Sequence, residues 1–149
     1  MTDPIVQAYY VRGHGKDPVT LTTAADADAL IDAMLAETFS NSVGTLYADT
    51  RPKSAAGRAD HELRIALHSE TKVGGIRYAG GDVKGSWYVS GQMSEREEVF
   101  YYYQGHDEGW PRDSEVSIDQ VRQAVREFIE GNGARPTGFE WTKWPDDVQ

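Results

Sequence analysis

The side chains that most often catalyse reactions or bind metals are sparse in this sequence and poorly spaced for either task. The 149 residues include four histidines and no cysteine, which excludes thiol nucleophiles, disulfides and cysteine-based zinc sites. His61 and His68 are seven residues apart, which is not the spacing of a metal pair on a strand. His106, Asp107 and Glu108 are adjacent between two glycines, a pattern more typical of a solvated loop than of a metal site. We predict no metal and no cofactor.

Other catalytic motifs are also missing from the sequence. The pairs Gly74-Gly75 and Gly80-Gly81 precede no helix start and no Gly-Lys-Ser/Thr, so they do not form a phosphate loop. No serine lies in a Gly-x-Ser-x-Gly elbow. These absences indicate that the protein is not an enzyme. The alternative is a small-ligand or nucleotide-binding enzyme of an α+β class, whose site would use four residues of one sheet face: Tyr101, Tyr103, Trp87 and His68.

Aromatic and acidic residues of the second half are better suited to binding another protein. Tyr101 to Tyr103 place aromatic rings on both faces of a strand, where they either pack internally or meet a partner. Trp110 lies among carboxylates in a predicted loop, which fits a binding hot spot and, equally, a ring folded back over the helix. The candidate partner-binding residues are Trp87, Tyr101, Tyr103, Asp107, Glu108, Trp110, Asp113, Glu115 and Trp144.

The net charge is −9 and the isoelectric point is about 4.8, which disfavours direct binding to nucleic-acid phosphates. The charge is uneven: residues 1–91 contain 11 acidic and 9 basic residues, whereas residues 92–149 contain 13 acidic and 6 basic residues. Such an acidic half is either a solvated surface or a surface that attracts a basic partner.

A family resemblance accompanies this acidic half. Ser117 begins an amphipathic stretch, Gly131-Asn132-Gly133 ends it, and Arg135-Pro136 and Trp141 follow. Together with the tyrosine-rich strand and the segment 110–116, these features resemble the Imm1 family, which comprises immunity proteins of bacterial polymorphic toxin systems. The resemblance implies a basic cognate toxin domain as the partner. It further implies that this toxin acts on nucleic acid, deaminases being prominent among such toxins, and that the protein occludes its active site or substrate groove.

The elements that would position these residues follow from hydrophobic periodicity. Apolar residues at helical spacing predict helices from Thr23 to near Phe39 and from Ser117 to Glu130, each with a capping residue at its start. Alternating or β-branched runs predict strands at 5–11, 43–49, 61–69, 73–79, 85–90, 97–104 and 139–144, with a short extended piece at 19–22. The segments 51–60 and 105–114 are predicted to be loops, and residues 80–82 a hairpin turn.

These elements predict one α+β domain over residues 1–149. A mostly antiparallel twisted sheet of about six or seven strands, forming a meander, would carry both amphipathic helices on one face. No apolar run approaches the roughly 18 residues of a membrane span, and the first residues lack the pattern of a signal peptide. We therefore expect a cytoplasmic protein that does not bind membranes.

Overall fold

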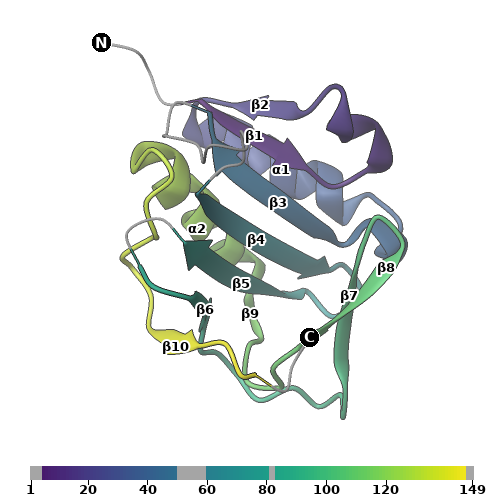
Figure 1. Cartoon of the computed structure of the whole chain (residues 1–149). Helices are drawn as coiled ribbons and strands as arrows, with labels where there is room; N and C mark the ends of the chain where they lie inside the picture. Colours follow the sequence, from purple (N-terminus) through teal and green to yellow (C-terminus); the bar gives the residue numbers. More distant parts are fainter. Residues whose placement is uncertain (1–4, 50–59, 81–82, 147–149) are drawn as a thin grey trace.

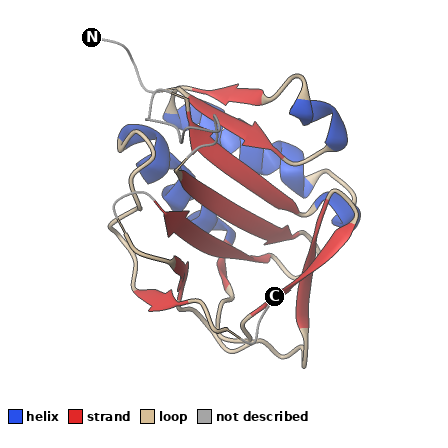
Figure 2. Ribbon diagram, in the orientation of Figure 1, coloured by secondary structure: helices blue, strands red, loops and turns tan. Residues whose placement is uncertain are grey.

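The computed structural model describes residues 5–49, 60–80 and 83–146. Its main sheet has the strand order β10-β6-β5-β4-β3-β1-β2, with the short β9 paired to β5, and every pairing is antiparallel. Both α-helices lie behind this sheet in Figures 1 and 2. The predicted α+β class and the predicted placement of both helices on one face are confirmed.

The strands and helices have the following bounds. The first half contains β1 (Val6–Tyr9), the 3₁₀ helix η1 (Arg12–Gly15), β2 (Val19–Leu21), α1 (Ala24–Leu35), η2 (Phe39–Asn41), β3 (Val43–Ala48) and β4 (His61–His68). The second half contains β5 (Val73–Gly80), β6 (Ser86–Val89), β7 (Val99–Tyr103), β8 (His106–Trp110), β9 (Val116–Ser117), α2 (Ile118–Glu130) and β10 (Trp141–Lys143).

Helix α2 forms as its sequence predicts. The Ser117 hydroxyl accepts the backbone N–H of Gln120, and the Gln120 side chain accepts the backbone N–H of Ser117, completing a capping box. One stripe of the helix is buried against the sheet: Val121, Ala124, Val125, Phe128 and Ile129. Helix α1 lies beside it and buries Ala27, Leu30, Ile31 and Met34 in the same core.

Helix α1 ends at Leu35, four residues before the predicted end near Phe39. Thr38 is extended, with φ −68° and ψ 156°, so the chain leaves the helix before Phe39. Phe39 therefore does not continue the apolar stripe of α1. Its ring is 38% exposed and lies 4.8 Å from the His68 ring and 5.4 Å from the Tyr102 ring, between centroids.

The predicted meander holds for β3 to β6 and fails at β7. These four strands are successive antiparallel neighbours, as short connections require. Strand β7 does not join them. Among the described residues it pairs with β8, and the two form a separate hairpin. The loop predicted for 105–114 is therefore wrong at 106–110, where the hairpin's second strand lies.

The hairpin β7–β8 crosses the sheet face opposite the helices at one end (Figure 1). The side chains between hairpin and sheet form a second, smaller core of Val43, Ala66, Tyr88, Val99, Tyr101, Trp110 and Trp144. Beside this core, Thr45, Arg64 and Arg77 are in register across β3, β4 and β5 on the same sheet face. The molecule thus has one face closed by helices and one face only partly covered by a hairpin.

Two predicted connections fall largely outside the described residues, namely the loop 51–60, apart from Asp60, and the turn 80–82, apart from Gly80. Within the described ranges, neither helix is long and apolar enough to cross a membrane.

Candidate partner-binding site

Backbone hydrogen bonds and one close approach fix the hairpin on the sheet. The backbone N–H of Ser42 donates to the carbonyl of Tyr102 at 3.0 Å, and the Tyr102 N–H donates to the Ser42 hydroxyl at 2.9 Å. At the turn, the Gly105 N–H donates to the carbonyl of Ser40 at 2.8 Å. At the other end the Trp110 ring lies so close to Gly75 that a Cβ there would be 2.7 Å from Cζ3 of the ring. The hairpin is therefore held at both ends.

Aromatic rings fill the space under the hairpin. Tyr101 is 0% exposed and Trp110 is 4% exposed, and their ring centroids are 5.6 Å apart in an edge-to-face contact. Trp144 follows β10, is 8% exposed and meets the Trp110 ring at 5.3 Å. Trp110 was predicted either to be a binding hot spot or to fold back over the helix. The second interpretation holds in part, because the ring is folded inward, but onto the sheet rather than onto a helix.

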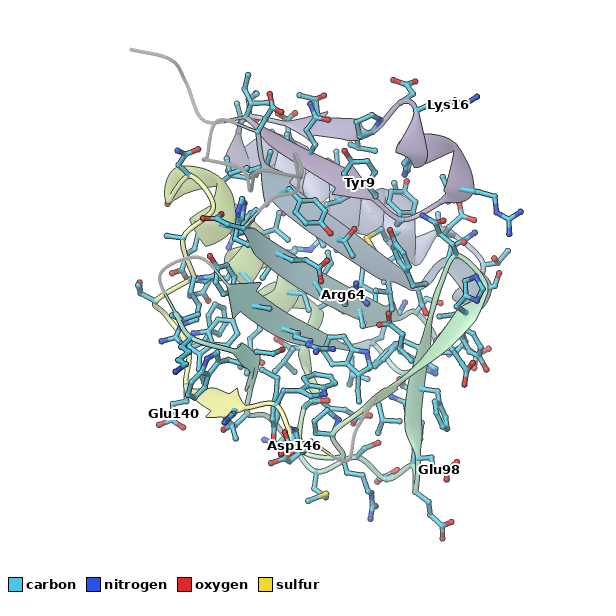
Figure 3. The ribbon with its side chains drawn as sticks, viewed as in Figure 1. Tyr9, Lys16, Arg64, Glu98, Glu140 and Asp146 are labelled. Carbon is cyan, nitrogen blue, oxygen red and sulfur yellow. The ribbon has the colours of Figure 1, made fainter. Side chains whose placement is uncertain are left out.

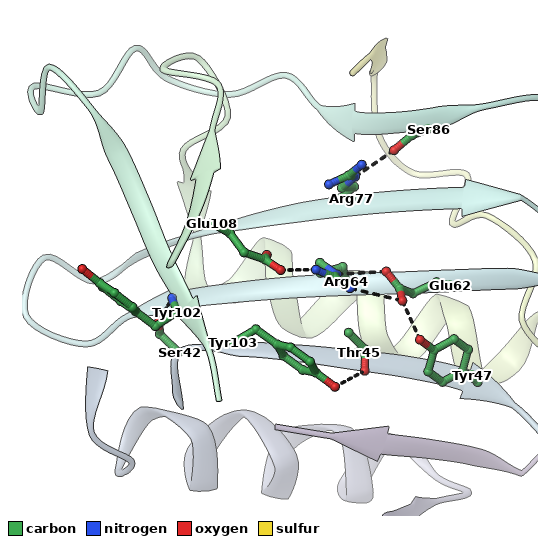
Figure 4. A network of polar contacts seen from close by, with 10 residues as sticks. All are labelled: Ser42, Thr45, Tyr47, Glu62, Arg64, Arg77, Ser86, Tyr102, Tyr103 and Glu108. Carbon is green, nitrogen blue, oxygen red and sulfur yellow. Dashed lines mark hydrogen bonds and ion pairs between the residues drawn. The ribbon is translucent and has the colours of Figure 1, made fainter. Parts of the chain in front are cut away.

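A polar network lies beside these rings on the sheet, with Arg64 of β4 at its centre (Figure 4). Arg64 Nε donates to Glu62 at 2.9 Å, and Nη1 pairs with Glu108 of the hairpin. The guanidinium also lies 5.3 Å from the centroid of the Tyr103 ring. The hydroxyl of Tyr47 donates to Glu62, so β3, β4 and β8 are joined through one arginine.

The network sets the charge states of its members. Burial raises the pKa of Glu108, and the nearby Arg64 and Arg77 counter this only in part. Burial alone would lower the pKa of Arg64, but Glu62 and Glu108 outweigh it and the pKa is raised. Burial and the adjacent Glu62 also raise the pKa of the Tyr47 phenol. Arg64 is consequently a fixed cation shared by two carboxylates.

Two further arginines pair with rings of the second core. Arg96 donates to Glu115 at 3.0 Å and lies 5.3 Å from the centroid of the Tyr101 ring. Arg77 donates to Ser86 at 2.7 Å, and its guanidinium lies 3.8 Å from the centroid of the Trp144 ring. Each of these inward-facing rings therefore has an arginine of the same chain against it.

The structure brings most of the sequence-predicted residues to the hairpin and its base, but it turns most of them inward. Tyr101, Trp110 and Trp144 are buried, while Tyr103 and Glu108 are half-buried. Glu115 pairs with Arg96, and Asp113 accepts a hydrogen bond of 2.8 Å from the Tyr88 hydroxyl. Burial and this bond raise the pKa of Tyr88 to about 12. Among the predicted residues on the hairpin, only Asp107 is exposed.

Trp87 does not join the others. It pairs in register with Tyr78, whose side chain belongs to the core under the helices, so Trp87 lies on the opposite side of the sheet from the hairpin. Its indole N–H donates to the carbonyl of Lys84 at 2.9 Å, and Arg135 lies 5.6 Å from its ring. The four residues of the alternative enzyme site, which include Trp87, are therefore not assembled on one face.

Phe100 and Tyr102 occupy the outer side of the hairpin, and neither was among the residues predicted to bind a partner. The alternation of β7 places Tyr101 and Tyr103 on one side and these two residues on the other. In Figure 4 the Tyr102 ring points away from the network, whereas Tyr103 points toward it. Phe39 adds a third partly exposed ring beside Tyr102. The alternation was visible in the sequence, but not which side would meet the sheet.

Three of the four histidines accept backbone hydrogen bonds. His14 Nδ1 accepts the N–H of Tyr10 at 3.1 Å, His61 Nε2 that of Ala48 at 2.8 Å and His68 Nδ1 that of Thr71 at 3.3 Å. These bonds hold turns and strand ends in place. Among the described residues, no group of three or more histidine, aspartate or glutamate side chains could hold a metal ion.

The described chain is thus a two-layer α+β protein with an aromatic hairpin laid across its second sheet face. The model of the Imm1 immunity protein family matches residues 15–143. The chain belongs to this family, as the resemblance indicated. A comparison with curated proteins gave no match.

Proposed function

We propose that this protein binds a cognate bacterial toxin domain and neutralises it. The observation that carries the proposal is the family match over residues 15–143, which includes every element from α1 to β10. The charge distribution supports it, because residues 92–149 hold a net charge of −7 from 13 acidic and 6 basic residues. This half of the chain supplies the hairpin that lies over the sheet.

The proposed mechanism is occlusion of the toxin's active site or substrate groove. A toxin that acts on nucleic acid needs a basic groove for phosphates and apolar walls on which bases stack. An acidic protein surface with exposed rings offers the same two kinds of contact and can take the place of the substrate. We propose a nucleic-acid-targeting deaminase as the toxin, since deaminases extrude the target base into a pocket that such a surface can cover.

Co-expression tests this function directly. The toxin domain encoded beside the gene is expressed from an inducible promoter in bacterial cells, with and without this protein. We expect growth only when both are present, and a stable one-to-one complex by size-exclusion chromatography. Equal killing in both strains would refute the function.

The reaction is then identified with the purified toxin domain and single-stranded DNA or RNA. Conversion of cytosine to uracil or of adenine to hypoxanthine would support the deaminase assignment, and strand cleavage would refute it.

The same preparation tests the alternative of a ligand-binding enzyme. Thermal unfolding with a panel of nucleotides and nucleosides would show an increased Tm if the chain bound one of them. We expect no increase, because Trp87 is separated by the sheet from Tyr101, Tyr103 and His68.

A further inference from the structure

The inner side of the hairpin repeats one arrangement of three groups, namely an aromatic ring, an arginine over it and a carboxylate paired to that arginine. Tyr103, Arg64 and Glu108 form one such set, with the guanidinium 5.3 Å from the ring centroid. Tyr101, Arg96 and Glu115 form the other, at the same 5.3 Å. In both sets the chain itself supplies all three members, so neither set has a vacancy for a partner.

The outer side of the hairpin has two of these three groups. Tyr102 of β7 stands directly opposite Asp107 of β8, so both side chains project to the same side. Phe100 precedes Tyr102 by two positions in β7 and shares that side, and the exposed Glu98 lies just before the strand begins. Phe39 lies against Tyr102, with ring centroids 5.4 Å apart. We call these five residues the outer patch: Phe39, Glu98, Phe100, Tyr102 and Asp107.

The arginine is the member that the outer patch lacks. Glu98 and Asp107 are exposed, and within the described ranges neither forms an ion pair. None of the three rings has an arginine or lysine of the described chain over it. The chain thus presents a ring beside an unpaired carboxylate, which is the arrangement that its own arginines occupy on the inner side.

We propose that the outer patch binds an arginine of the toxin domain, with the guanidinium over Tyr102 and paired to Asp107. This inference rests on the proposed function and assigns the surface that performs it. Arginine fits better than lysine because its planar guanidinium stacks on a ring while donating to a carboxylate. Phe39 and Phe100 flank Tyr102, exclude water from the pair and so strengthen it. Glu98, near the far end of the hairpin in Figure 3, adds attraction for a basic surface.

Substitutions of the outer patch test the assignment in the purified complex with the toxin domain encoded beside the gene. Tyr102→Leu keeps an apolar side chain and removes the aromatic face, while Asp107→Asn keeps the shape and removes the charge. We expect each to weaken binding by about 10-fold, and the pair together by about 100-fold or more, measured by calorimetry. Two matched controls lie away from the hairpin in Figure 3, namely Tyr9→Leu on β1 and Glu140→Gln beside β10. We expect both to bind within about twofold of the wild type.

The possible outcomes distinguish a wrong surface assignment from a wrong proposed function. If the wild type binds and protects cells but the outer-patch variants do so equally well, the surface assignment is wrong and the proposed function stands. If the wild type binds no toxin domain, both are wrong. Circular dichroism and thermal unfolding verify that each variant is folded. Tyr102→Trp provides a second check, because it keeps a ring for the guanidinium and should retain binding that Tyr102→Leu loses.

Discussion

Arg64 neutralises two carboxylates that reach it from different parts of the chain. Its side chain is 20% exposed, and those of Glu62 and Glu108 are 25% and 19% exposed, so water screens the three charges only in part. Removing the cation leaves two adjacent carboxylates without their partner. We expect Arg64→Met to lower the free energy of unfolding by about 2–3 kcal/mol, measured by urea denaturation. Adding Glu62→Gln and Glu108→Gln to this variant should restore most of the loss, and a failure to do so would show that packing, not charge, causes it.

Glu108 should make the stability depend on pH in a particular direction. Folding raises its pKa, so the folded state holds the proton more tightly than the unfolded state does. The resulting cost of ionisation is absent below the ordinary glutamate pKa, appears as the pH rises and is complete above the raised pKa. The stability of Glu108→Gln relative to the wild type should therefore increase as the pH rises through the ordinary glutamate pKa and become constant above the raised pKa. A stability difference between Glu108→Gln and the wild type that did not change with pH would contradict this prediction.

Which residues face outward on the hairpin could be predicted only in part. The sequence separates Val99, Tyr101 and Tyr103 from Phe100 and Tyr102. Val99 and Tyr101 are buried, and the half-buried Tyr103 ring lies beside Arg64 on the same side. The sequence does not say which set meets the sheet, because both contain tyrosine and both are apolar enough for a core. Residues distant in sequence determine which side meets the sheet. Gly75 leaves room for Trp110, and Arg64 pairs with Glu108.

At the level of elements, Gly75 of β5 leaves the space that the Trp110 ring of the hairpin occupies. A Cβ there would lie 2.7 Å from Cζ3 of the buried Trp110 ring, so either the ring or strand β8 must shift. We expect Gly75→Ala to destabilise the protein by about 1–3 kcal/mol and to speed hydrogen exchange in β7 and β8. Gly13→Ala is the matched control, because no atom lies within 4 Å of its added Cβ. Unchanged exchange in the hairpin of Gly75→Ala would show that Trp110 adapts without moving the strand.

The N-cap of α2 should contribute measurably to stability. The Ser117 hydroxyl satisfies a first-turn N–H that would otherwise lack a partner in the helix. We expect Ser117→Ala to cost about 1 kcal/mol in urea denaturation, and Ser117→Asp to cost little, since aspartate also caps helices well. Equal losses in the two variants would attribute the effect to the β9 pairing at Ser117 rather than to the cap.

The helices and the strands of the main sheet were easier to predict from sequence than the second strand of the hairpin. Both helices and the strands of the main sheet other than the two-residue β9 were predicted, because capping residues and periodicity act within a few residues. Strand β8 was missed because His106-Asp107-Glu108-Gly109 has neither β-branched residues nor an apolar alternation. It is a strand because β7 pairs with it and Trp110 anchors its end, and both are tertiary effects.

At the scale of the whole molecule, a net charge of −9 should govern how fast the complex forms. Long-range attraction accelerates the encounter of oppositely charged proteins, and dissolved salt screens it within about 10 Å at 0.1 M. We expect the association rate constant with a basic toxin domain to fall by about 10-fold or more between about 50 mM and about 500 mM NaCl.

The dissociation rate constant should change less with salt than the association rate constant does, because it reflects the rings and paired charges already in contact. Stopped-flow fluorescence measures both constants. Glu140→Lys and Asp107→Lys change the net charge equally, so both should slow association at low salt. Faster dissociation should follow only from Asp107→Lys, which alters the outer patch. If Glu140→Lys accelerated dissociation as much, the contact would extend to the β10 edge of the sheet.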